Sequence, residues 1–145
     1  MDAEISYSSA YGGSKKFTQQ QVVTANATGF GAAADDYAER GIDLNERLVR
    51  NKPATFFFRM NSDAMLGADI GLGDILIVDR SIKAVTGKII VAIVEGELLV
   101  RRLQKNFNGA VLIAENNKFG NINLSYFDDR GHVWGVVTYA IKQFG

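Results

Sequence analysis

Short apolar and aromatic runs recur from residue 54 to residue 142, most of them separated by glycine, asparagine or aspartate. Runs of roughly four to eight residues between such turn signals are typical of β-strands. Two of the runs are separated only by Glu95-Gly96, which predicts a tight hairpin. The pattern as a whole predicts a mainly β protein with six or seven strands in a rolled antiparallel architecture. The expected strands are ATFFFRM (54–60), ILIVD (75–79), KIIVAIV (88–94), ELLVRRLQ (97–104), AVLIAE (110–115), INLSY (122–126) and HVWGVVTYAIK (132–142).

One short helix is predicted over DLNERLVRN, residues 43–51. Asp43 can cap its first turn, and Glu46 follows three residues later, as in a capping box. Pro53 ends the helix, because the residue before a proline is pushed out of helical geometry.

The first 36 residues or so differ in composition from the rest of the chain. They are rich in Ser, Gly, Ala, Gln and Thr and show no sustained hydrophobic period. Such a segment cannot bury enough apolar surface to offset the entropy lost on ordering. We interpret it as a flexible arm that docks on the domain or on a partner. It is too short to hold a helical DNA-binding domain.

Composition and charge limit the classes of function. The chain has 145 residues, of which 47% are hydrophobic, and this suits one globular domain. Sixteen basic and sixteen acidic residues cancel, so direct DNA binding is not expected. There is no cysteine for disulfides or thiol chemistry, and the longest apolar run is too short to cross a membrane. With no signal-peptide pattern at the start, we expect a soluble, cytoplasmic protein.

An elaborate polar and glycine-rich turn, NSDAMLGADIGLG (61–73), precedes the strand predicted at 75–79. Turns of this kind in front of a core strand usually position a functional group, yet the central residue, Ala64, has no chemistry. Ser62 has a hydroxyl that could act as a nucleophile. A serine nucleophile needs a base such as a neutral lysine, and none is expected near Ser62. A turn serine that hydrogen-bonds the backbone is the better interpretation.

No metal or cofactor site is expected. His132 is the only histidine, and a single histidine without a partner is more often a surface or interface residue. The acidic pairs Asp35-Asp36 and Asp128-Asp129 are isolated, and we interpret them as turn and helix-cap chemistry.

Several stretches, taken in order, resemble the LexA-like family of self-cleaving Ser-Lys peptidases, and in particular its UmuD-type members. The resemblance runs from about Thr28 to Tyr139 and implies a LexA/UmuD-like rolled β peptidase fold. It also implies a cleavable arm over residues 1–28 and a peptidase-fold domain over residues 29–145. The stretches that carry it are TGF…DDYAERGIDLNERL (28–48), SDAM (62–65) where the family has Gly-Asp-Ser-Met, GLGDILIVD (71–79), GELLVRRLQ (96–104) and WGVV (134–137).

Members of this family cut their own N-terminal arm. A serine attacks the peptide bond before a glycine, and a buried, poorly charged lysine takes the serine's proton. The resemblance places the cut at Thr28-Gly29, the serine position at Ala64, the lysine position at Arg101, and Ser62, Asp63 and Met65 in the site loop.

All three functional positions depart from the family pattern. Thr28 is bulkier than the Ala or Cys that normally precedes the cut. Ala64 cannot attack a carbonyl, and Arg101 cannot act as a base because a guanidinium stays protonated in proteins. We therefore expect a protease scaffold without its chemistry, which remains full-length. A lone serine-to-alanine change is typical of engineering, whereas the loss of both residues is more typical of a natural pseudo-protease; both origins stay open.

The resemblance implies a homodimeric SOS-response protein, an accessory subunit of an error-prone translesion DNA polymerase. Its expected partners are a UmuC-like Y-family polymerase subunit and the RecA filament that stimulates cleavage in the family. One alternative is the cleavable C-terminal half of a LexA or phage-type repressor, which the short arm disfavours. Another is a non-cleaving dimerisation module. A signal peptidase shares the Ser-Lys site, but no membrane segment is predicted here.

Overall fold

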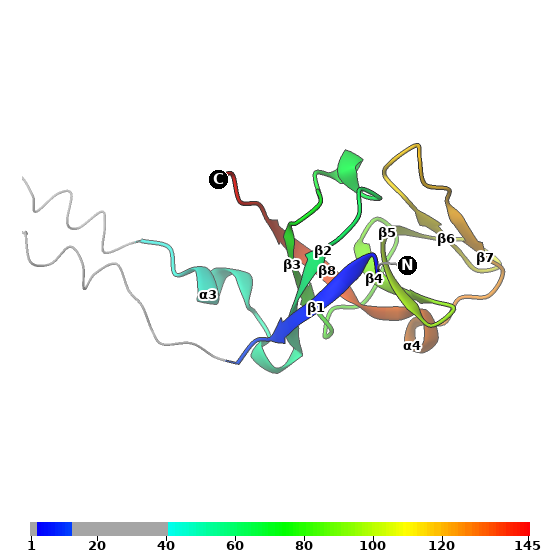
Figure 1. Cartoon of the computed structure of the whole chain (residues 1–145). Coiled ribbons are helices and arrows are strands. Elements are labelled where there is room, and N and C mark those ends of the chain that lie inside the picture. The colour runs from blue at the N-terminus through cyan, green and yellow to red at the C-terminus, as the bar shows by residue number, and fades with distance from the viewer. Residues whose placement is uncertain (1–2, 13–40) are drawn as a thin grey trace, which may run out of the picture. The chain divides into compact units, whose positions relative to one another are not determined.

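The computed structural model describes residues 3–12 and 41–145. The chain divides into two compact units, one made of Met1–Tyr11 with Asn51–Gly145 and the other of Gly12–Arg50. The first unit carries all eight described strands, and the described part of the second carries helix α3 (Leu44–Leu48) (Figure 1).

Eight strands form one sheet in the order β1-β2-β3-β8-β4-β5-β6-β7, in which neighbours run antiparallel. Seven of them match the predicted runs to within a few residues at each end. The mainly β fold is therefore confirmed. The strands are β1 (Ile5–Ala10), β2 (Thr55–Met60), β3 (Ile75–Asp79), β4 (Ile89–Val94), β5 (Glu97–Lys105), β6 (Ala110–Ile113), β7 (Ile122–Leu124) and β8 (Val133–Ile141).

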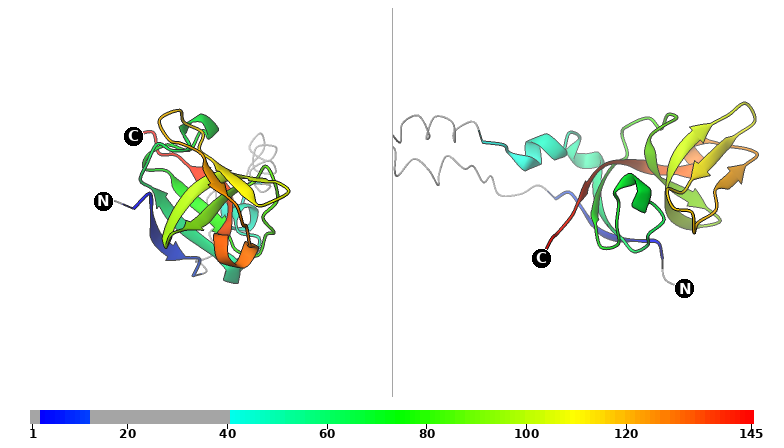
Figure 2. Two further views of the ribbon diagram at one scale, coloured as in Figure 1. Left: turned by 90° about the vertical axis from the view of Figure 1, so that its right-hand side faces the viewer. Right: turned by 90° about the horizontal axis from the view of Figure 1, so that it is seen from above.

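The sheet is curled, and its edge strand β1 returns to contact β5 (Figure 2). Register shifts interrupt the β1–β2, β3–β8 and β4–β8 pairs. Such bulges bend a strand and increase its twist, which promotes curling. The contact with β5 includes a hydrogen bond of 2.6 Å, in which the backbone N–H of Val100 donates to Oε2 of Glu4. The residue just before β1 is thereby brought onto β5.

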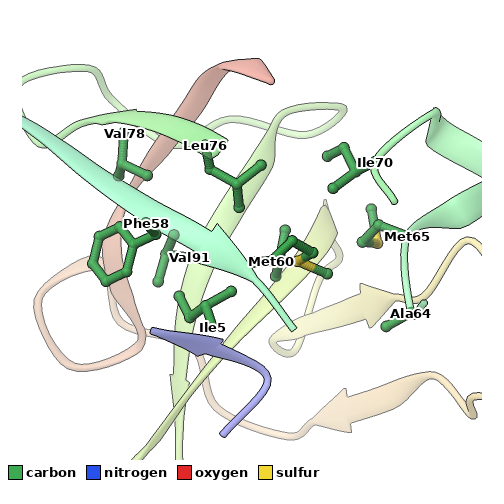
Figure 3. Packing of buried hydrophobic residues seen from close by; sticks show 10 residues of the cluster. Ile5, Phe58, Met60, Ala64, Met65, Ile70, Leu76, Val78 and Val91 are labelled. Carbon is green, nitrogen blue, oxygen red and sulfur yellow. The ribbon is translucent and has the colours of Figure 1, made fainter. Parts of the chain in front are cut away.

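Two groups of buried apolar side chains form the core. The first core cluster joins β1, β2, β3, β4 and β5 to the loop between β2 and β3 (Figure 3). Trp134 packs against it, with its ring 5.1 Å from Phe56 and 5.0 Å from Phe58 in edge-on geometry. The first core cluster consists of Ile5, Phe58, Met60, Ala64, Met65, Ile70, Leu76, Val78, Val91 and Val100, and the second of Ala84, Ile90, Ala92, Leu103, Ala110, Leu112 and Val136.

Strand β1 lies within the segment that the sequence suggests is a flexible arm. Only Ile5 in this strand is buried, and the five residues after it are exposed. A strand with one core residue has little hydrophobic period, so its composition resembles that of a mobile segment. Its pairing with β2, from Ile5 opposite Met60 to Ala10 opposite Phe56, is long-range, so the local sequence does not show which strand it joins. The part of the predicted arm from residue 13 to residue 28 lies outside the described residues.

Helix α3 is shorter than the predicted 43–51 helix, because Val49 is already extended. Asp43 caps it as expected, with its side chain accepting from the N–H groups of Asn45 and Glu46. A second short helix, α4 (Asp129–His132), was not predicted, although its cap is the expected Asp128. No helix in the described part of the chain is long and apolar enough to cross a membrane.

Candidate functional site

The loop between β2 and β3 is held in place by apolar side chains. Ala64 and Met65 are 0% exposed and Ile70 is 3% exposed, and all three enter the first core cluster (Figure 3). A single 3-10 turn, η3 (Leu66–Ala68), follows Met65. The methyl group of Ala64 is therefore a packing element of the core.

Polar contacts close the same loop at both ends. The Ser62 hydroxyl accepts from the N–H of Ala64 at 3.3 Å, which confirms the predicted role of a turn serine. At the far end, the buried carboxylate of Asp74 accepts from the N–H of Gly71 at 2.8 Å and from the ammonium of Lys142. The loop therefore has a defined shape that does not depend on a catalytic group.

Residues after β6 clamp the loop from outside. The N–H of Glu115 donates to the carbonyl of Ala64 at 2.9 Å, and the carbonyl of Glu115 accepts from the N–H of Gly67 at 2.7 Å. The side-chain amide of Asn116 donates to the carbonyl of Asp63 at 2.7 Å. Asp63 itself is exposed, so its contribution to this clamp is made by its backbone.

Arg101 is buried in β5 against a carboxylate. Its Nη1 donates to Oε1 and Oε2 of Glu4 at 2.8 and 2.7 Å, and to the carbonyl of Val100 at 2.8 Å. The side chains of Arg101 and Glu4 are only 6% and 8% exposed. The position expected to carry the general base therefore holds a buried ion pair.

The Ala64 and Arg101 positions border the same core cluster. Ala64 is a member of it, and Phe119 packs against it. The guanidinium carbon of Arg101 lies 5.9 Å from the centroid of the Phe119 ring. Nε of Arg101 is buried and has no hydrogen-bond partner among residues 3–12 and 41–145. Phe119 thus connects the Arg101 side chain to the core cluster that contains Ala64.

Glu4 is the site residue that the sequence reasoning missed. Its backbone carbonyl accepts from the N–H of Asn61 at 2.7 Å while its side chain binds Arg101. One residue therefore joins the start of the site loop to β5. The available signal was the alternation of Ile5 and Tyr7 with serines directly after Glu4, a strand-type period. The polar remainder of the arm obscured it.

Other predicted positions lie elsewhere. Thr28 and Gly29, the expected cleavage residues, and the Asp35-Asp36 pair fall outside the described residues. His132 is part of the α4 turn, where its ring stacks on Phe127 at 5.6 Å and its Nδ1 accepts from the N–H of Asp128. Within the described ranges, no group of three or more His, Cys, Asp or Glu side chains could hold a metal ion.

A family model for Peptidase S24-like proteins matches residues 21–138. The chain belongs to this peptidase family. It is 34% identical to Protein ImpA of Escherichia coli over 116 residues. This match covers 79% of this chain and 77% of ImpA. Protein MucA of Escherichia coli is 33% identical over 115 residues, which is 79% of this chain and 78% of MucA.

Two further comparisons place the chain within the family. Protein SamA of Salmonella typhimurium strain LT2 is 35% identical over 118 residues, which is 79% of each chain. A LexA repressor of Shewanella piezotolerans is 28% identical over 116 residues, which is 80% of this chain but 56% of the repressor. The predicted resemblance to UmuD-like members of the family is confirmed.

The loop clamp predicts that Gly67→Ala is destabilising. A Cβ at Gly67 would lie 2.7 Å from the backbone oxygen of Glu115, so a shift of the loop would disturb their hydrogen bond. We expect the free energy of unfolding to fall by about 1–3 kcal/mol. Gly71→Ala is the matched control, because its nearest neighbour is the flexible Lys142 ammonium at 3.5 Å. Urea unfolding compares the two variants, and equal losses of stability would contradict the clamp.

Proposed function

We propose that the protein is a UmuD-type accessory subunit of an SOS-induced translesion DNA polymerase, and that it does not cleave itself. The observation that carries the proposal is the Peptidase S24-like match over residues 21–138, and the family resemblance assigns Ala64 and Arg101 to the positions of the serine and the lysine. Similarity to ImpA, MucA and SamA over 79% of the chain supports the UmuD-like assignment.

The chemistry of a Ser-Lys dyad supports the inactivity. The serine oxygen attacks the peptide carbonyl while a neutral lysine accepts the hydroxyl proton. Ala64 offers no attacking oxygen, and the guanidinium of Arg101 stays protonated and offers no base. Nη1 of Arg101 is in addition bound to both carboxylate oxygens of Glu4. The proposed cleavage bond, Thr28-Gly29, would therefore stay intact and the arm would stay attached.

The proposed partners follow from the same family. We propose a homodimer that acts in the cytoplasm with a UmuC-like Y-family polymerase subunit and with the RecA filament. A formal net charge of zero supports protein partners over direct contact with DNA phosphates. Without cleavage, the dimer would remain in the full-length form that acts as a checkpoint in the family.

A second candidate is a non-cleaving relative of the LexA-type repressors. Its support is the 28% identity to the Shewanella piezotolerans LexA repressor. The match covers only 56% of that repressor, whereas ImpA, MucA and SamA are covered over 77–79% of their length. The comparison therefore favours the polymerase-subunit role.

The dyad assignment predicts a stepwise restoration of cleavage. Ala64→Ser alone restores a nucleophile without a base, so the precursor should stay uncut at alkaline pH. Adding Arg101→Lys should produce slow cutting at Thr28-Gly29, because β-branched Thr28 fits poorly where the family has Ala or Cys. Thr28→Ala should then increase the rate. The measurement is a gel time course with mass spectrometry of the new N-terminus. Efficient cleavage by Ala64→Ser alone would show that Arg101 is not the base position.

The polymerase-subunit role predicts a dimer that binds protein rather than DNA. Light scattering should give twice the chain mass, and a Y-family polymerase subunit from the same genome should co-elute with the full-length chain. Bare duplex DNA should show no measurable binding at physiological salt, because the formal charge is balanced. Tight DNA binding that weakens steeply with salt would instead support the repressor role.

A further inference from the structure

One edge of β5 is unpaired where it passes Glu4. β4 pairs with residues 97–102 of β5, whereas β6 pairs only with residues 102–105. Among the described strands, the edge of β5 over residues 97–101 that faces away from β4 therefore has no partner. The N–H of Val100 donates to Oε2 of Glu4 at 2.6 Å instead. Unpaired strand edges are natural docking sites for an extended segment.

Two donors from β5 converge on the same carboxylate. Nη1 of Arg101 reaches both oxygens of Glu4 at 2.7–2.8 Å, and the Val100 N–H reaches one of them. Charge-assisted hydrogen bonds of this kind are stronger than neutral ones, and a guanidinium is well suited to carboxylates. Nε of Arg101 is a further buried donor without a partner in the described part of the chain. The chemistry of this cradle selects a carboxylate.

We propose that the position of the lost base has become a carboxylate-binding site, and that its ligand is Glu4 of the chain's own N-terminal strand. β1 lies along β2 as an added strand, with Glu4 as its polar anchor and Ile5 as its apolar anchor in the first core cluster. The remodelled protease site thus works as a self-docking site that holds β1 on the sheet. This inference rests on these contacts and does not depend on the proposed polymerase role.

β1 is also held by its pairing with β2, by the Tyr7 ring 5.6 Å from that of Phe58 and by a hydrogen bond of 2.7 Å from the Asn61 amide to the Ser6 hydroxyl, but Glu4 supplies the buried charged contact. Apart from Ile5, which is 4% exposed, every residue of the strand is exposed. A register shift between Tyr7 and Ser9 also interrupts its pairing with β2. Removing one member of a buried ion pair leaves the other without compensation, which is strongly unfavourable. Loss of either charge should therefore increase local opening of β1 while the rest of the sheet stays folded.

Hydrogen–deuterium exchange of the full-length chain tests this anchoring. In Glu4→Gln, the amides of residues 5–10 that hydrogen-bond to β2 should exchange about tenfold faster or more, because β1 opens locally. Arg101→Gln should give a similar increase. Glu115→Gln is the matched control, because it alters the neighbouring Arg102–Glu115 pair, whose side chains are 36% and 30% exposed. In the control, exchange of β1 should stay at the parent rate. Amides of β3 and β4, followed in the same experiment, should stay protected in all variants.

The double variant Glu4→Gln/Arg101→Gln separates a direct contact from two independent effects. If both residues act through one contact, it should exchange no faster than the faster single variant. If exchange of β1 in the double variant were accelerated by the product of the two single-variant factors, the proposal would be overturned. Exchange of β1 at the parent rate in Glu4→Gln would also overturn the proposal. This single variant is a sufficient test even if the Arg101 variants do not fold. Protection of β1 that rises with protein concentration would place the strand on a second copy and overturn the self-docking assignment.

Discussion

A buried arginine needs a counter-charge, and the arrangement of this site depends on that constraint. A buried lysine can release its proton and become neutral, whereas a guanidinium remains charged in proteins. Arg101 therefore carries a permanent charge on a side chain that is only 6% exposed, at the position that we propose corresponds to the family's lysine. Such a charge is tolerated only with a well-placed partner. Glu4 supplies that partner and, through it, ties the N-terminal strand β1 to β5.

Packing and backbone hydrogen bonds fix the shape of the site loop. Buried apolar residues, with Ala64 among them, fix the site loop, and the backbone of Glu115 clamps it from outside. Neither contribution requires a nucleophile or a base. In such a fold, the residues of the site determine the function, and the architecture alone does not. The loop therefore keeps its shape with Ala64 at its centre, and the Arg101 side chain on β5 binds a carboxylate.

Local signals explain which parts of the structure were predictable. The strands of residues 55–141 have apolar runs and turn residues, Asp43 and Asp128 are typical caps, and Ser62 lies in a turn that its hydroxyl stabilises. The features that the sequence could not indicate depend on contacts between residues that are far apart along the chain. Glu4 and Arg101 are 97 positions apart, and β1 is a strand only because β2 is beside it. The Thr28-Gly29 bond remains a prediction.

Cleavage by the restored dyad, with and without Glu4→Gln, tests the central claim most directly. A carboxylate within about 4–6 Å favours the charged form of a lysine, so Glu4 should keep the lysine of Arg101→Lys from acting as a base. In the Ala64→Ser/Arg101→Lys background, we expect Glu4→Gln to raise the initial rate of cutting at Thr28-Gly29 by about tenfold or more. Glu97→Gln, at an exposed carboxylate on the same strand as Arg101, should leave the rate unchanged. Equal rates with and without Glu4→Gln would contradict the account, because the carboxylate of Glu4 would then not control the position of the lost base.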